Sequence, residues 1–93
     1  MVANVNDALE LNPTRLGTLE LGDVWVPYIN LVDADFLPSR IRLGKDEYAF
    51  QSSILVKGHS AMLPGRIGDL RAAGKEPLIV ERADRYYVFV TPP

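Results

Sequence analysis

Hydrophobic and polar residues alternate in the first half of the chain, which is the pattern of strands with one buried side. The alternation covers residues 18–21 and 24–26, on either side of Gly22-Asp23. A two-residue Gly-Asp connection is typical of a β-hairpin. In the predicted hairpin Leu21 faces Val24, Leu19 faces Val26, and Glu20 faces Trp25.

The same pattern predicts two more hairpins. The second joins residues 39–43 to residues 47–57 around Gly44-Lys45-Asp46, and the third joins residues 78–82 to residues 86–90 around Ala83-Asp84. The long strand of the second hairpin has an apolar inner face made of residues of one parity: Tyr48, Phe50, Ile54 and Val56. Pro27 cannot donate to a ladder, so the strand that follows Trp25 is expected at an edge or bent.

After Gly58 the apolar spacing becomes helical. Leu63, Ile67 and Leu70 recur at intervals of four and three residues, which predicts one helix over about residues 60–74. Ser60 can cap its start, Pro64 suits the first turn, and Gly74 suits a left-handed cap at its end. Gly65 and Gly68 weaken the helix, and we attribute both to close packing against a sheet.

The length of 93 residues fits one domain with one core. We predict a loose N-terminal arm over residues 1–15 and a single α+β domain over residues 16–93. The domain is expected to be a mostly antiparallel, curved sheet or small split barrel with one packed helix.

The C-terminal hairpin is apolar on both faces, since both parities of residues 78–80 and 86–90 are apolar or aromatic. The helix can cover one face, so the other must meet a second sheet, a barrel interior or another subunit. Aromatic residues are enriched in cores and in protein interfaces, and the sequence leaves these two roles open. The candidate interface residues are Trp25, Tyr28, Tyr86, Tyr87 and Phe89, with Arg82 and Arg85 at the rim.

Charge and composition narrow the class of protein. A net charge of -2 argues against nucleic acid or an anionic membrane as the main partner. The chain has no cysteine, which excludes disulfides and thiolate metal sites. It also lacks the apolar runs of a secretory signal or a membrane span. We expect a soluble, intracellular protein.

Three patterns suggest chemistry, but each lacks a feature that the corresponding site requires. His59 and Ser60 with Asp69 could form a relay, but spacing alone shows neither an oriented base nor an oxyanion site. Asp33 and Asp35 could bind a cation, but they lack the surrounding oxygen ligands of a calcium loop. Residues 64–68 contain glycines without matching a phosphate-binding motif. We predict no catalytic residues, no metal site, no cofactor and no small-molecule substrate.

Residues 47–90 are predicted to form a long strand, a helix and a hairpin, in that order, and the last strand begins within Asp84-Arg85-Tyr86-Tyr87-Val88. This order resembles split-barrel proteins of phage tails, namely distal tail, tail-terminator and baseplate components. This resemblance implies a structural, non-enzymatic role. Partners would be other copies of the chain or other assembly proteins. The protein would be cytoplasmic before assembly and would then become part of a virion or tail-like particle.

A second resemblance covers residues 70–82, Leu-Arg-Ala-Ala-Gly-Lys-Glu-Pro-Leu-Ile-Val-Glu-Arg, which are similar to the helix-to-hairpin segment of prevent-host-death antitoxins. It implies the alternative function of a small dimeric DNA-binding regulator. Salt-dependent binding to duplex DNA distinguishes the regulator from the assembly protein.

Overall fold

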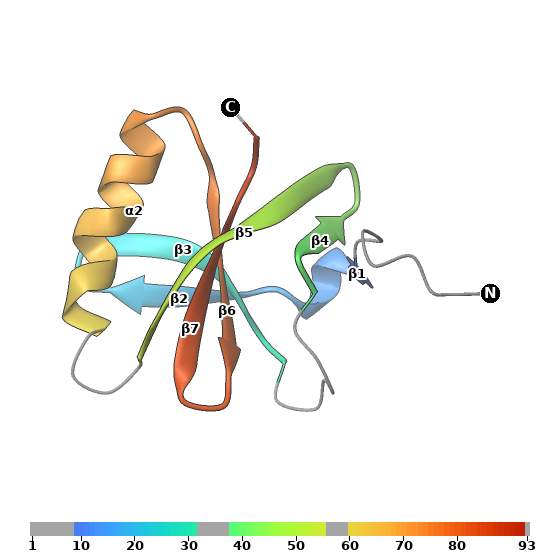
Figure 1. The fold of residues 1–93 in the computed structure, drawn as a ribbon, viewed down its shortest axis with the longest axis horizontal. Coiled ribbons are helices and arrows are strands. Elements are labelled where there is room, and N and C mark those ends of the chain that lie inside the picture. Colours follow the sequence, from blue (N-terminus) through green and yellow to red (C-terminus); the bar gives the residue numbers. More distant parts are fainter. Residues whose placement is uncertain (1–8, 32–37, 56–59, 93) are drawn as a thin grey trace.

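The fold is known from a computed structural model, which describes residues 9–31, 38–55 and 60–92 and the side chains of all of these except residues 54, 55 and 60. The elements in chain order (Figure 1) are β1 (Leu9–Leu11), η1 (Pro13–Arg15), β2 (Gly17–Leu21), β3 (Val24–Asn30), β4 (Arg40–Leu43), β5 (Asp46–Leu55), η2 (Ser60–Met62), α2 (Leu63–Ala72), β6 (Pro77–Arg82) and β7 (Arg85–Val90).

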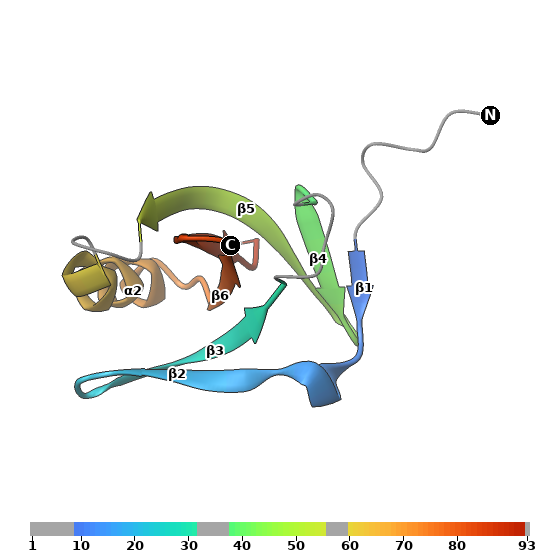
Figure 2. The same cartoon turned by 90° about the horizontal axis from the view of Figure 1, so that it is seen from below.

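The described strands form one seven-stranded sheet in the order β1-β4-β5-β7-β6-β3-β2. Most neighbours are antiparallel, while β1 with β4 and β3 with β6 are parallel. The sheet curls so that β2 and β3 lie on one side and β5 arches over the other (Figure 2). The α+β prediction of a curved, mostly antiparallel sheet with one packed helix is therefore confirmed.

Both faces of the C-terminal hairpin are covered by the chain itself. One face packs in what we call the barrel core, formed by Ile29, Leu31, Ile41, Leu43, Tyr48, Leu78, Val80 and Phe89. The other packs in the helix core, formed by Val26, Leu63, Ile67, Leu70, Ile79, Val88 and Val90. Because β6 and β7 are central strands between these cores, they must be apolar on both sides.

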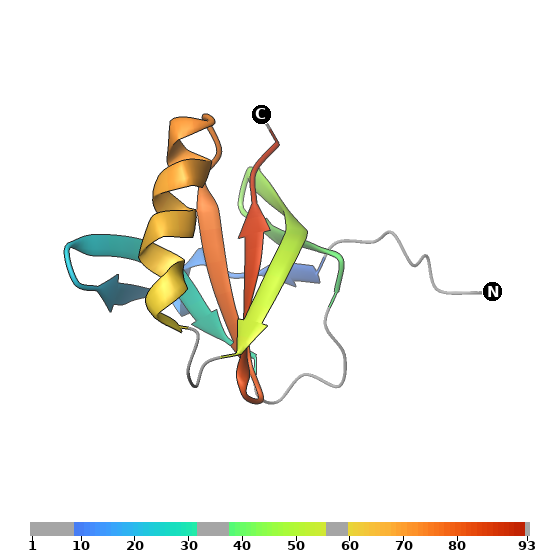
Figure 3. The same cartoon turned by 60° about the vertical axis from the view of Figure 1, so that its left-hand side comes forward.

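The helix lies along the sheet beside β6 (Figure 3) and contributes Leu63, Ile67 and Leu70 to the helix core. Burying each of these side chains contributes roughly 1.5–3 kcal/mol. As predicted, Pro64 lies in the first turn and Gly74 has a left-handed φ of 82°. The explanation offered for Gly65 and Gly68 is wrong, because a Cβ at either position would meet nothing within 4 Å.

A β-bulge between Phe50 and Ser52 changes the face that β5 presents. Tyr48, before the bulge, is buried in the barrel core, whereas Phe50 is 45% exposed. Beyond the bulge, Ser52 accepts a hydrogen bond from Arg66 of α2, on the side of the helix core. Phe50 lies opposite Phe89 of the barrel core, with ring centroids 5.8 Å apart, whereas Ser52 lies opposite Val88 of the helix core. The prediction of one continuous inner face is therefore wrong beyond the bulge; Val56 lies outside the described residues.

The first hairpin has the predicted register, with Leu21 opposite Val24 and Glu20 opposite Trp25. The strand that contains Pro27 was expected at an edge or bent; β3 lies between β2 and β6, so the edge alternative is wrong. Pro27 is tolerated there because pairing with β6 begins only at Tyr28. The true edge of this half of the sheet is β2.

The N-terminal segment is partly built into the sheet. Residues 9–11 of the predicted arm form β1, which pairs in parallel with β4, and η1 follows at Pro13–Arg15. Leu9 and Leu11 pack against the barrel core. The sheet therefore has β1 at one edge and β2 at the other, joined along the chain by η1.

Candidate functional site

The predicted interface residues are dispersed through the molecule. Phe89 is fully buried in the barrel core, so of its two possible roles the structure gives it the core role. Tyr87 is half-buried against the same core and contacts Phe50, with ring centroids 6.2 Å apart. The C-terminal hairpin is the centre of the sheet, so its apolar faces are unavailable to another subunit in the folded chain.

Tyr28 and Tyr86 are brought together at the edge of the helix core. The Tyr28 hydroxyl donates a hydrogen bond to the Glu81 carboxylate, and Tyr86 lies opposite Glu81 in the β6–β7 ladder. Desolvation by burial and then the hydrogen bond to Glu81 raise the pKa of Tyr28 to about 12. Burial likewise raises the pKa of Tyr86. Both tyrosines therefore keep their protons at neutral pH, and the Tyr28 hydroxyl links β3 to β6.

The two predicted rim arginines flank the turn of the C-terminal hairpin. Arg82 is half-buried and has its own interaction partner, while Arg85 is exposed. The two face each other across the ladder, where like charges directly opposite are destabilising. They lie at the tip of β6 and β7, next to the Glu81–Tyr86 pair.

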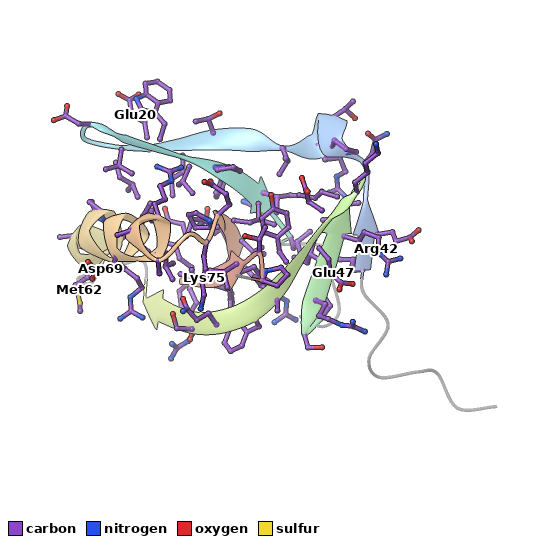
Figure 4. All side chains as sticks on the ribbon, turned by 90° about the horizontal axis from the view of Figure 1, so that it is seen from above. Glu20, Arg42, Glu47, Met62, Asp69 and Lys75 are labelled. Atoms are coloured by element: carbon purple, nitrogen blue, oxygen red, sulfur yellow. The ribbon has the colours of Figure 1, made fainter. Side chains whose placement is uncertain are left out.

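Trp25 is the residue best placed for an interface. It is 56% exposed, on the opposite face of β3 from Tyr28. Its side of the hairpin also carries Glu20, which points away from α2 (Figure 4). Beside it lies a shallow groove of about 380 Å³, lined by Leu16, Gly17, Thr18, Trp25, Val26 and Pro27. We call this feature the Trp25 groove.

The backbone of Trp25 is held by the helix. Arg71 of α2 donates from Nη2 to the Trp25 carbonyl oxygen at 2.8 Å, and its Nε lies 3.8 Å from a Glu76 carboxylate oxygen. The exposed indole is therefore carried on a fixed strand, which reduces the entropy lost when a partner binds.

A second hollow, of about 390 Å³, lies between β5 and α2. It is lined by Gln51, Met62, Arg66, Asp69 and Leu70. Met62 is 53% exposed, and Figure 4 shows it beside Asp69. Arg66 is already bound to Ser52 at 3.0 Å, and the hollow also presents the Asp69 carboxylate, the Gln51 amide and the Met62 thioether. This lining offers packing surface and lacks an oriented acid and base.

The other chemical patterns are only partly within the described chain. His59, Asp33 and Asp35 lie outside the described residues, and the Ser60 side chain does too. Among the residues that the structure describes, no group of three His, Cys, Asp or Glu side chains could hold a metal ion. None of the described helices has both the length and the apolarity needed to cross a bilayer.

The sequence did not predict the exposure of Phe50 and Met62 or the presence of the Trp25 groove. No residue of β5 predicts the bulge that follows Phe50. The groove lies beside the part of β3 that precedes its pairing with β6, and this pairing could not be predicted from neighbouring residues. Met62 precedes α2 without facing the sheet, which the position of Leu63 in the apolar pattern could have indicated. Comparison with protein-family models, with curated proteins and with solved structures gave no significant match.

Proposed function

We propose that this protein is a non-enzymatic assembly protein, a component of a phage tail or tail-like particle, that joins copies of itself or other assembly proteins. The observation that carries the proposal is the exposed Trp25 beside a groove on the outermost hairpin of the sheet. Tryptophan is enriched in protein interfaces, particularly at the few positions that dominate their energetics.

The exposed part of Trp25 is large enough to matter energetically. A tryptophan buries up to about 250 Å² when fully covered. Since 56% of Trp25 is exposed, covering that part would contribute roughly 3 kcal/mol at about 25 cal/mol per Å². A contribution of this size corresponds to about a hundredfold in an association constant. A partner on this face would therefore gain substantially from the one side chain.

The order of elements supports the choice of tail proteins among assembly proteins. A long strand, β5, leads through η2 into one helix and then into a hairpin, on a curved sheet. This is the plan on which the resemblance to split-barrel tail components rests. The proposal assigns no catalytic step to the chain.

Light scattering coupled to size exclusion, over a wide range of protein concentration, tests the proposal. We expect a mass above that of the monomer that increases with concentration, or a stable complex with a co-purified assembly protein. A chain that stays monomeric at every concentration and co-purifies with nothing contradicts the proposal. Binding to duplex DNA at low salt would favour the dimeric regulator instead.

A further inference from the structure

The two edges of the sheet differ in how well they can accept another strand. β1 has three residues, and its Glu10 is bound to Arg42 of the neighbouring β4 at 2.8 Å. β2 has five residues in an unbroken register, contains no proline or bulge, and carries one charged side chain, Glu20. Edge strands are usually protected by such features, because unpaired backbone groups are a template for another chain. β2 is the less protected edge.

The free backbone groups of β2 follow from the geometry of the hairpin. Leu21 and Val24 flank a two-residue turn and form a hydrogen-bonded pair, after which the pairs alternate between bonded and non-bonded. The Glu20–Trp25 and Thr18–Pro27 pairs are therefore non-bonded. The Arg71 bond to the Trp25 carbonyl agrees, since that oxygen points away from β2. The N–H and C=O groups of Thr18 and Glu20 consequently point outward from the sheet.

Two copies of β2 can satisfy these groups reciprocally. In an antiparallel pair centred on Leu19, Thr18 of each copy lies opposite the partner's Glu20, and all five residues of β2 are paired. A shift by two residues in one direction places Glu20 opposite the partner's Glu20, where like charges destabilise the pair. The opposite shift places Leu21 opposite the partner's Arg15, which belongs to η1, and shortens the ladder.

We propose that the β2 edge is an interface between two copies of this chain, paired antiparallel with Leu19 on the two-fold axis. The inference rests on the proposed function and names the surface and partner that it would use. The symmetric arrangement is self-complementary, as an isologous contact requires. It also extends the outer face of the hairpin across the interface. In order across the strands, that face then carries Trp25, Glu20, the partner's Thr18 and the partner's Pro27.

Cysteine cross-linking tests both the surface and the register, because the natural chain has no cysteine. In the proposed pair the two Leu19 Cα atoms are about 4.5 Å apart, the spacing of a directly opposed non-bonded pair. The two Thr18 or two Glu20 Cα atoms are diagonal, at about 7–8 Å. A disulfide needs Cα atoms within about 7 Å, so only Leu19→Cys is well placed.

We expect Leu19→Cys to form a covalent dimer under mild oxidation roughly tenfold faster or more than the matched variants Thr18→Cys and Glu20→Cys. Circular dichroism of each reduced variant confirms folding. Because Leu19 packs against the helix core, the double variant Thr18→Cys/Glu20→Cys supplies a second test at two exposed positions. It should also dimerise covalently, since Thr18 faces the partner's Glu20.

Other outcomes separate the inference from the proposed function. Faster cross-linking through Thr18→Cys or Glu20→Cys alone would overturn the register and with it the proposal. If no variant cross-links while light scattering shows an oligomer, the interface lies elsewhere and only this inference falls. If no variant cross-links and the chain is monomeric and without a partner, both the inference and the proposed function fall.

Discussion

Phe89 and Trp25 lie at opposite ends of the burial range, although both are large aromatic residues on strands of one sheet. Phe89 is fully buried between β6, β5 and the curled end of the sheet, while Trp25 is 56% exposed. The difference arises because β7 is central and β3 extends past the covering strands. A substitution should therefore affect stability at Phe89 and association at Trp25.

Replacing Phe89 by alanine should lower the free energy of unfolding by about 3–5 kcal/mol, because it leaves a cavity in the barrel core. Trp25→Ala should change it by less than about 0.5 kcal/mol, since the side chain is on the surface. Urea denaturation of the two variants at low concentration measures both values. If Phe89→Ala is too unstable to study, Phe89→Leu should still cost more than Trp25→Ala. Equal effects would place Phe89 outside the core.

The hydrogen bond between Tyr28 and Glu81 gives a prediction about alkaline pH. The pKa of Tyr28 is about 12 in the folded chain and 10.0 ordinarily. The unfolded chain therefore loses this proton first, so the contribution of Tyr28 to stability is complete below pH 10 and declines as the pH rises toward 12.

Urea denaturation just below pH 10 and again near pH 12 measures this decline. The wild-type chain should lose more stability between the two than Tyr28→Phe, which has no phenol at this position. Tyr48 and Tyr86 also have raised pKa values, but they are present in both proteins and cancel in the comparison. An equal decline would show that Tyr28 titrates normally.

At the scale of elements, α2 is attached to the sheet by its apolar face and by two arginines, one bound to a side chain of the sheet and the other to its backbone. Arg66 binds Ser52 of β5, and Arg71 binds the Trp25 carbonyl of β3. The second contact fixes the strand that carries the proposed interface. It replaces a ladder bond that β6 does not supply, because pairing with β6 begins at Tyr28.

Arg71→Ala should lower the free energy of unfolding by about 0.5–1.5 kcal/mol, the usual net contribution of one hydrogen bond. Arg85→Ala is the matched control, since Arg85 is exposed and lies opposite another arginine. Its removal should change stability little. Chemical denaturation of both variants measures the two changes in the free energy of unfolding. If Arg71→Ala lowers it no more than Arg85→Ala does, the contact between Arg71 and the Trp25 carbonyl contributes nothing to stability.

The sequence predicted the local elements well because each depends on neighbouring residues. Gly22-Asp23 and Ala83-Asp84 define tight turns, and the spacing of Leu63, Ile67 and Leu70 defines the buried face of α2. Strand order depends on contacts between distant residues, so the parallel pairing of β3 with β6 had no local sign. The core role of Phe89 follows from that order. Among the aromatic candidate interface residues, only the solvent exposure seen in the fold separates Trp25 from the others.

At the scale of the whole molecule, the curled sheet closes its central strands and leaves β2 at a free edge. The covering of both faces of β6 and β7 removes the C-terminal hairpin as a surface for assembly. Among the exposed surfaces of the described residues, the β2–β3 hairpin combines outward backbone groups with the exposed Trp25. The central claim is that this hairpin joins copies of the chain.

Amide hydrogen exchange, measured residue by residue by NMR at low and at high protein concentration, tests that claim most directly. Leu19 and Leu21 are bonded to β3 and should be protected at both concentrations. Thr18 and Glu20 should exchange freely at low concentration and become protected at the concentration where light scattering shows association. Free exchange of Thr18 and Glu20 in the associated protein would contradict the account.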